Sequence, residues 1–181
     1  MSVPKRGLLL SALLLSTLLL CAGCEDRKGV QVGDSPPSIS GSDIRGDSVS
    51  LAKLKGKIVL ICFWTNSCCG DNVKELQSLY RKYESKGLAV LAINEMDAKK
   101  DVQSFAKTNG LTFTILTDEN SELLKQYQVF AFPTYYIVDR NGVLRQRILG
   151  EIQSGKLEEL ILRQFDVNKR AEESYEKLHS R

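Results

Sequence analysis

The stretch that most constrains the fold is a continuous apolar run, Ile58–Trp64, which ends in a polar break and two adjacent cysteines, Cys68 and Cys69. A short apolar run closed by a polar break is typical of a buried strand. After the cysteines, apolar residues recur with the spacing of an amphipathic helix. The sequence therefore predicts a strand followed by a helix over Asp71–Ser85, with Cys68 at the junction.

The junction gives Cys68 a chemical context. The first turn of a helix presents unpaired N–H groups and the positive end of the helix dipole. A thiol placed there is more readily ionised, and the thiolate is the reactive form of cysteine. We expect Asp71 to cap this helix, and its charge to oppose ionisation of Cys68. Glu95 follows the next predicted strand, and we expect it to be a solvated loop acid.

The rest of the chain alternates strands and helices. A second continuous apolar run, Leu88–Asn94, predicts a strand covered on both faces. Further predicted elements are short strands at Ile39–Ser40 and Asp47–Leu51, a helix capped by Asp97 and ending at Asn109, a strand at Phe113–Leu116, a helix capped by Asn120, a hairpin of Thr134–Asp139 and Val143–Leu149 around Asn141-Gly142, and a last helix from Ser154. This order predicts an α/β three-layer sandwich with a mixed central sheet, parallel in its first part and antiparallel at the hairpin.

The N-terminus predicts export and anchoring. Met1–Arg6 is basic, and Leu8–Leu20 is an apolar run of 13 residues, shorter than the ~20 that span a membrane. Residues 1–23 therefore resemble a secretory signal peptide. The end of this segment resembles a bacterial lipobox, which implies that Cys24 is lipidated, although Cys21 stands where an aliphatic residue is usual. The alternative is a plain signal peptide with an incidental Cys24. Either way, the chain is expected in the periplasm or extracytoplasmic space, where disulfide chemistry is possible.

Composition divides the remaining chain into three parts and excludes some functions. We expect residues 24–35 to be a flexible tether, residues 36–167 to form one domain, and residues 168–181 to be a charged tail that is frayed or disordered.

The 25 basic and 22 acidic side chains give a net charge of +3, which does not suggest nucleic-acid binding. The single histidine, His179, disfavours a histidine-assisted triad and most imidazole metal sites, so no metal or cofactor is expected.

Over about residues 33–166 the chain resembles thioredoxin-fold proteins of the TlpA/ResA-like extracytoplasmic (redoxin) branch. Three features carry the resemblance: Gly56-Lys57 leading into the strand that ends in Phe63-Trp64, Cys68 four residues after Trp64, and Phe132-Pro133-Thr134 leading into Tyr135–Asp139. The resemblance implies that Cys68 is the nucleophile and that Pro133 is cis and faces it. It also implies that Trp64, Phe132 and Thr134 border the substrate. The partners would be protein thiols or disulfides and a membrane electron donor.

The redox motif departs from the family's C-x-x-C pattern. Here the four positions are Cys68-Cys69-Gly70-Asp71, so Asp71 replaces the resolving cysteine. Three outcomes follow: Cys68 and Cys69 act as a pair, Cys68 acts alone with release by an external thiol, or the site is retired. A disulfide between neighbours holds the Cα atoms about 3.8 Å apart, below the usual range of roughly 4.4–6.8 Å, so such a bond should be easily reduced.

Two rival functions stay open beside a membrane-anchored thiol-disulfide oxidoreductase. A non-catalytic binding module is favoured by Asp71 and by Lys74, which stands where the family often has an acid. A peroxiredoxin-like peroxidase would need Thr65, which is present, and a proline where Ile61 stands. Cys62, inside the central strand, is expected to be a small buried hydrophobic residue.

Overall fold

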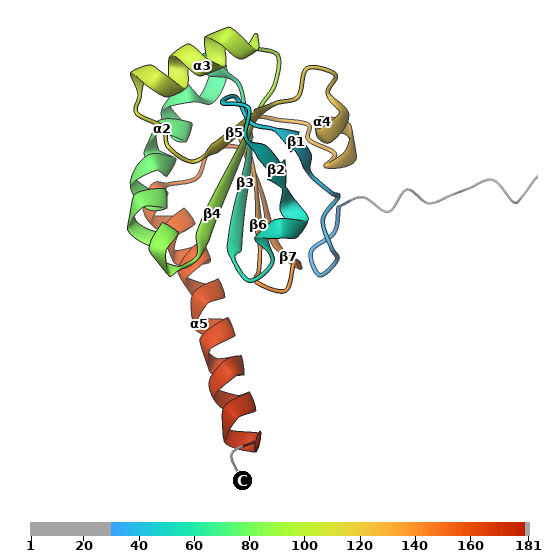
Figure 1. The fold of residues 1–181 in the computed structure, drawn as a ribbon, viewed down its shortest axis with the longest axis vertical. Coiled ribbons are helices and arrows are strands. Elements are labelled where there is room, and N and C mark those ends of the chain that lie inside the picture. The colour runs from blue at the N-terminus through green and yellow to red at the C-terminus, as the bar shows by residue number, and fades with distance from the viewer. Residues whose placement is uncertain (1–29, 180–181) are drawn as a thin grey trace, which may run out of the picture.

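The computed structural model describes residues 30–179 (Figure 1). The predicted signal peptide and Cys24 lie outside the described residues. The elements are β1 (Ser40–Ser42), β2 (Ser48–Ser50), η2 (Leu51–Leu54), β3 (Ile58–Trp64), α2 (Asn66–Tyr83), η3 (Glu84–Lys86), β4 (Leu88–Asn94), α3 (Lys99–Thr108), β5 (Thr114–Thr117), α4 (Glu122–Gln126), β6 (Thr134–Val138), β7 (Leu144–Leu149) and α5 (Ser154–His179).

The two apolar runs form the middle of a five-stranded mixed sheet with the order β5-β4-β3-β6-β7. β3 pairs in parallel with β4, and β4 with β5, whereas β6 is antiparallel to both β3 and β7. All residues of β3 and β4 are buried, because helices or a hairpin cover both faces. The predicted mixed sheet and its change of direction at the hairpin are confirmed.

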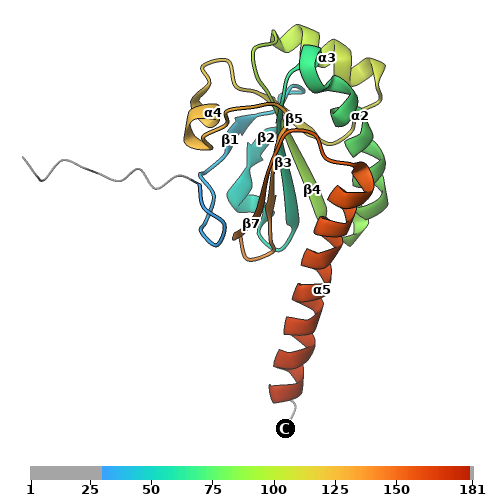
Figure 2. The same cartoon turned by 180° about the vertical axis from the view of Figure 1, so that it is seen from behind.

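Two separate apolar cores lie on the two faces of the sheet. Alternate residues of β3, beginning with Ile58, face α2, α3 and α5, while the others, beginning with Val59, face the β1–β2 hairpin and α4. Figures 1 and 2 show this division from opposite sides. The predicted three-layer α/β sandwich is confirmed, and it brings the carboxyl ends of β3 and β4 to one edge.

The helix after β3 begins at Asn66, not at Asp71. Thr65 is its N-cap, and the Thr65 Oγ1 accepts a hydrogen bond from the backbone N–H of Cys68 at 3.3 Å. Asp71 therefore lies inside the helix, where its carboxylate pairs with Lys74 Nζ at 2.7 Å in solvent. The prediction that Asp71 caps this helix is wrong, because the Thr65 hydroxyl, six residues earlier in the chain, takes that place.

Two other predicted caps also differ in the structure. Ala98 is the N-cap of α3, so Asp97 does not cap the helix that follows it. The N-cap residue of α4 is Ser121, not Asn120, and the carboxylate of Asp118 accepts hydrogen bonds from the backbone N–H groups of Glu122 and Leu124.

Backbone hydrogen bonds and helix continue on both sides of residues 36–167, the predicted domain. Gly33 and Asp34, expected in the tether, form backbone hydrogen bonds of 2.8 and 2.9 Å with Leu144. At the other end, α5 continues to His179, so the predicted tail is helical there. Figure 1 shows the distal half of α5 pointing away from the sheet. Within the described residues, no helix is both long and apolar enough to cross a membrane.

Candidate active site

Cys68 lies where the sequence predicts it, in the first turn of α2 directly after β3. Its side chain is exposed, and its thiol donates a weak hydrogen bond to the carbonyl oxygen of Phe132 at 3.7 Å. The peptide bond between Phe132 and Pro133 is cis, as the family resemblance implied. The structure therefore brings the predicted nucleophile against the predicted proline loop, which lies 64 residues further along the chain.

Cys69, the next residue, is turned into the core. Its backbone (φ −142°, ψ 27°) leaves the helical conformation at this one residue, and its side chain is only 1% exposed. The Cys69 Sγ lies 3.4 Å from the backbone nitrogen of Thr65, which donates to it. Burial raises the pKa of the Cys69 thiol to about 11, although the contact with the Thr65 backbone acts in the opposite direction. The two neighbouring sulfurs thus differ sharply in exposure.

Gly70 fills the third position of the motif for a steric reason. A Cβ built at this position would lie 3.0 Å from Cε2 of Phe105, which α3 packs against α2. The same phenyl ring lies on the indole of Trp64, with 5.1 Å between ring centroids. A side chain at position 70 would force Phe105 to shift within this cluster, so the close approach of α2 and α3 near Cys68 favours glycine.

The three residues expected to border the substrate differ in accessibility. Trp64 is fully buried, and Thr134 is too, with its hydroxyl donating to the Ala131 carbonyl at 2.6 Å. Neither side chain can contact a substrate at the surface directly, which corrects the expectation for both. Phe132 is only half-buried and packs against both cores. Its backbone and that of Pro133 form the border nearest to Cys68.

Cys62 is fully buried in β3, as expected for a small hydrophobic residue. Burial raises the pKa of its thiol well above the ordinary value, with the nearby Cys69 adding to the effect. Tyr135 lies directly across from Cys62 in the β3–β6 pairing. Burial likewise raises the pKa of the Tyr135 phenol, and Cys62 and Cys69 contribute to the rise. Cys62, Cys69 and Tyr135 therefore lie together beneath α2, and all three are protonated near neutral pH.

A carboxylate that was not expected from the sequence lies at the start of the site helix. The Asp97 Oδ2 accepts hydrogen bonds from the backbone N–H of Asn66 at 2.7 Å and from Asn94 Nδ2 at 2.9 Å. Asn66 is the first residue of α2, so Asp97 caps that helix from the loop after β4. In the sequence, this contact is indicated only by Asn94 and Asp97, a polar pair three residues apart at the end of a strand. The same pair is equally compatible with Asp97 capping the helix that follows it.

Glu95 is fully buried, so the expectation of a solvated loop acid is wrong. Its Oε2 accepts a hydrogen bond from the Ser121 hydroxyl at 3.4 Å, its buried Oε1 has no hydrogen-bond partner among the described residues, and the carboxyl of Asp118 lies nearby. Burial, with the adjacent Asp118 adding to it, raises the pKa of Glu95 from its ordinary 4.5 to about 8. At neutral pH Glu95 is therefore mostly a neutral acid behind the loop that carries Asp97.

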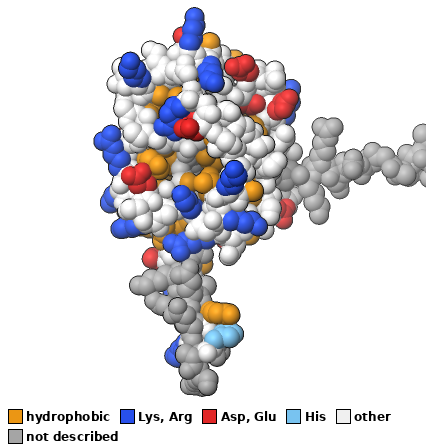
Figure 3. All heavy atoms as spheres, in the orientation of Figure 1, with side chains coloured by type: hydrophobic (Ala, Val, Ile, Leu, Met, Phe, Trp, Pro, Cys, Tyr) orange, Lys and Arg blue, Asp and Glu red, His pale blue; other side chains and the backbone are white. Residues whose placement is uncertain are grey.

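Exposed apolar side chains lie beside this edge of the sheet. Met96, on a left-handed backbone (φ 70°), is 87% exposed, and Phe130 is 80% exposed. Arg147 lies over the Phe130 ring, 5.7 Å from its centroid. On the face of the domain drawn in Figure 3, basic side chains are scattered, with acidic ones between them. Within residues 30–179, no group of three or more His, Cys, Asp or Glu side chains is placed to hold a metal ion.

Comparison with known sequences places these features in a family. The AhpC/TSA family matches residues 32–147 of the chain. The thiol-disulfide oxidoreductase ResA of Bacillus cereus is 28% identical over 167 residues, covering 86% of this chain and 95% of that protein. The thioredoxin-like protein YneN of Bacillus subtilis is 35% identical over 136 residues, covering 72% of this chain and 79% of that protein.

A comparison of structures agrees on the fold. The crystal structure of a thiol:disulfide interchange protein of the thioredoxin family from Chlorobium tepidum TLS superposes with a TM-score of 0.69 at 20% identity. The match covers 74% of this chain and 97% of that one. The central sheet and the helices on its faces are therefore those of the thioredoxin fold.

Proposed function

The chain belongs to the AhpC/TSA family, within its TlpA/ResA-like thioredoxin-fold branch, and from that membership we propose that it is a thiol-disulfide oxidoreductase that acts on protein thiols or disulfides. The observation that carries the proposal is the exposed Cys68 in the first turn of α2, against the carbonyl oxygen of Phe132. A sulfur at a helix N-terminus beside an accessible backbone carbonyl is placed to meet an extended substrate chain.

In the first step, the Cys68 thiolate attacks one sulfur of a substrate disulfide. The substrate S–S bond breaks, a bond forms between the Cys68 Sγ and the attacked sulfur, and the other substrate sulfur leaves as a thiolate. The attack needs an accessible sulfur. Cys68 meets this condition, whereas the neighbouring Cys69 is 1% exposed.

In the second step, Cys69 resolves the mixed disulfide. Its Sγ attacks the Cys68 Sγ, the bond between Cys68 and the substrate sulfur breaks, and the thiol proton of Cys69 passes to the departing sulfur, so the substrate leaves as a thiol. Two electrons have then passed from the cysteine pair to the substrate, and the pair is a disulfide. The departure of Cys69 from helical geometry supports this role, since the local chain is already out of the regular turn. The reverse sequence oxidises a substrate dithiol.

A non-catalytic binding module is the second candidate. It is favoured by Asp71, which stands at the helix position of the family's usual resolving cysteine and forms an ion pair with Lys74. In that case the proline loop and the exposed thiol edge would bind a partner without electron transfer.

A redox titration of the full-length protein separates these functions. At each potential, free thiols are alkylated and mapped by mass spectrometry. We expect Cys68 and Cys69 to become protected together as the potential rises, while Cys62 stays reduced. Cys62→Ala should leave the midpoint unchanged, and Cys69→Ser should prolong the mixed disulfide with a substrate such as insulin. If neither Cys68 nor Cys69 changes state across biological potentials, the binding module is the correct function.

The compartment is part of the same proposal. The predicted lipobox supports a domain tethered by lipid on Cys24 to a bacterial membrane, facing the periplasm or extracytoplasmic space and re-reduced by a membrane electron donor. Membrane fractionation tests the anchor: the wild type should sediment with membranes, and Cys24→Ala should be released. A Cys24→Ala variant that stays in the membrane with the same N-terminal mass would refute lipidation.

A further inference from the structure

We propose that Asp97 is a positioning residue for the buried cysteine of the pair: from the loop after β4, its carboxylate holds the start of α2 and places there a negative charge that opposes ionisation of Cys69. This inference rests on the proposed oxidoreductase function. It concerns a residue 28 positions away from Cys69 in the sequence, on a loop that is not part of the C-C-G-D motif.

The first support is the position of the Asp97 carboxylate. A single oxygen, Oδ2, accepts from the backbone N–H of Asn66 at 2.7 Å and from Asn94 Nδ2 at 2.9 Å. The first of these groups is one of the unpaired donors of α2, and the second fixes the carboxylate from the end of β4. A negative charge therefore sits at the positive end of the helix that carries both cysteines, and it offsets part of the dipole that would favour a thiolate there.

The second support is the backbone turn at Met96, which brings Asp97 to the start of α2. Met96 adopts a left-handed conformation (φ 70°), which is unfavourable for a residue other than glycine. The turn is held on both sides, by the Glu95 N–H bonded to the Trp64 carbonyl and by the Asp97 contacts. Since Met96 itself is 87% exposed, its side chain does not stabilise the turn, and the anchored neighbours are what hold it.

The third support is the set of groups that face Cys69. They are Cys62 from β3, Cys68 from α2, Tyr135 from β6 and Asp97 from the loop after β4. Burial is the largest reason that the pKa of Cys69 is raised; the neighbouring Cys68 adds to it, and Asp97 is the one carboxylate among the groups that do so. Cys62 and Tyr135 are neutral near pH 7, because burial raises the pKa of each.

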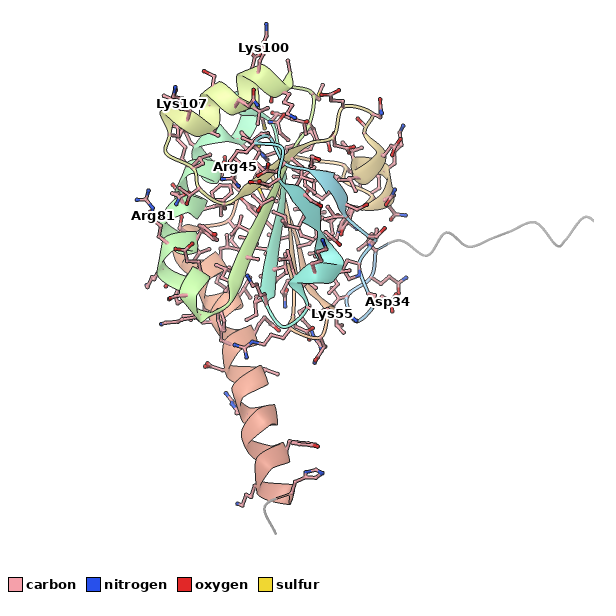
Figure 4. All side chains as sticks on the ribbon, viewed as in Figure 1. Asp34, Arg45, Lys55, Arg81, Lys100 and Lys107 are labelled. Atoms are coloured by element: carbon pink, nitrogen blue, oxygen red, sulfur yellow. The ribbon has the colours of Figure 1, made fainter. Side chains whose placement is uncertain are left out.

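Two of the three lysines of the adjoining helix, Lys100 and Lys107, do not pair with Asp97. Figure 4 shows Lys100, at the start of α3, pointing away from the body of the domain, and Lys107 lies at the far end of the same helix. Asp97 is thus a charge directed at the start of α2, not a member of a surface ion pair with either of these lysines.

The test measures the ionisation of Cys69 in the reduced full-length protein labelled with ¹³C at the cysteine Cβ atoms. Asp97→Asn keeps an oxygen for both hydrogen bonds and removes the charge, Asp97→Glu keeps the charge, and Asp101→Asn makes the same change at an exposed acid of α3. We expect the titration midpoint of Cys69 to fall by about half to one pH unit in Asp97→Asn. That shift is a three- to tenfold gain in thiolate at neutral pH. The midpoint should return in Asp97→Glu and not move in Asp101→Asn.

Three results would overturn the inference. The first is an unchanged titration midpoint of Cys69 in Asp97→Asn. The second is an equal fall of that midpoint in Asp97→Glu or Asp101→Asn. The third is a fall in Asp97→Asn that is accompanied by faster amide exchange at Cys69, which would mean that the start of α2 has loosened. None of these depends on electron transfer, so the titration is separate from the redox test of the proposed function. A wild type that is redox-inactive but shows the Asp97 effect would refute the function and not the positioning role.

Discussion

Replacing the buried Glu95 with glutamine should make the protein more stable at neutral pH. The structure holds this carboxyl at 0% exposure beside Asp118, and the pKa of Glu95 is raised from 4.5 to about 8. In the unfolded chain the same group loses its proton near 4.5. The native state thus keeps a proton that the unfolded state releases, so folding is most favoured below pH 4.5 and loses stability as the pH rises towards 8.

The magnitude follows from the size of that shift. Each pH unit between the two pKa values costs about 1.4 kcal/mol, so at pH 7 the upper limit is about 3 kcal/mol. Glutamine has no charge to desolvate, its carbonyl oxygen can accept from Ser121, and its amide can donate to Asp118. We therefore expect Glu95→Gln to gain about 1–3 kcal/mol at pH 7 and close to nothing at pH 4.5. For a domain of this size, each kcal/mol raises Tm by about 2–4 °C.

Urea denaturation of the wild type and Glu95→Gln at several pH values from 4.5 to 8.5 tests this expectation. Glu119→Gln, at an exposed acid in the loop between β5 and α4, is the matched control for the charge change. The stability difference between Glu95→Gln and wild type should widen steadily with pH, whereas Glu119→Gln should follow the wild type. Parallel curves for Glu95→Gln and wild type would refute the reasoning, since Glu95 would then titrate alike in both states.

Three further perturbations probe the scaffold around Cys68. Thr65→Ala removes the hydroxyl that caps α2 and should lower the free energy of unfolding, measured in urea, by about 1 kcal/mol. Thr65→Ser should retain most of that stability, and equal losses of stability in the two variants would mean that the cap contributes nothing. Leu157→Ala empties a site on α5 that is 3% exposed and should cost about 2–5 kcal/mol by the same measurement, so a loss under 1 kcal/mol would contradict the packing. Asp71→Cys supplies a second thiol one turn beyond Cys68 and should increase insulin-disulfide reduction, whereas Asp71→Ser should not; no gain would show that other parts of the site have diverged.

The order of elements could be predicted from the sequence because it depends on local patterns. Continuous apolar runs such as Ile58–Trp64 specify strands buried on both faces, and helical spacing specifies the layers that cover them. The position of Cys68 between strand and helix follows from the same patterns. Its contact with the Phe132 carbonyl required the family resemblance, since the two residues lie far apart in the chain.

The inward turn of Cys69 and the roles of Glu95 and Asp97 were decided only by the tertiary structure. An acid after a strand has the same sequence pattern whether its side chain meets water, a second carboxyl such as Asp118, or the start of another helix. Which of these occurs depends on the parallel pairing that brings the ends of β3 and β4 to one edge of the sheet. Local pattern thus determined which residues form strands and helices, while long-range packing determined which polar groups were removed from water, and with them the chemistry of the two sulfurs.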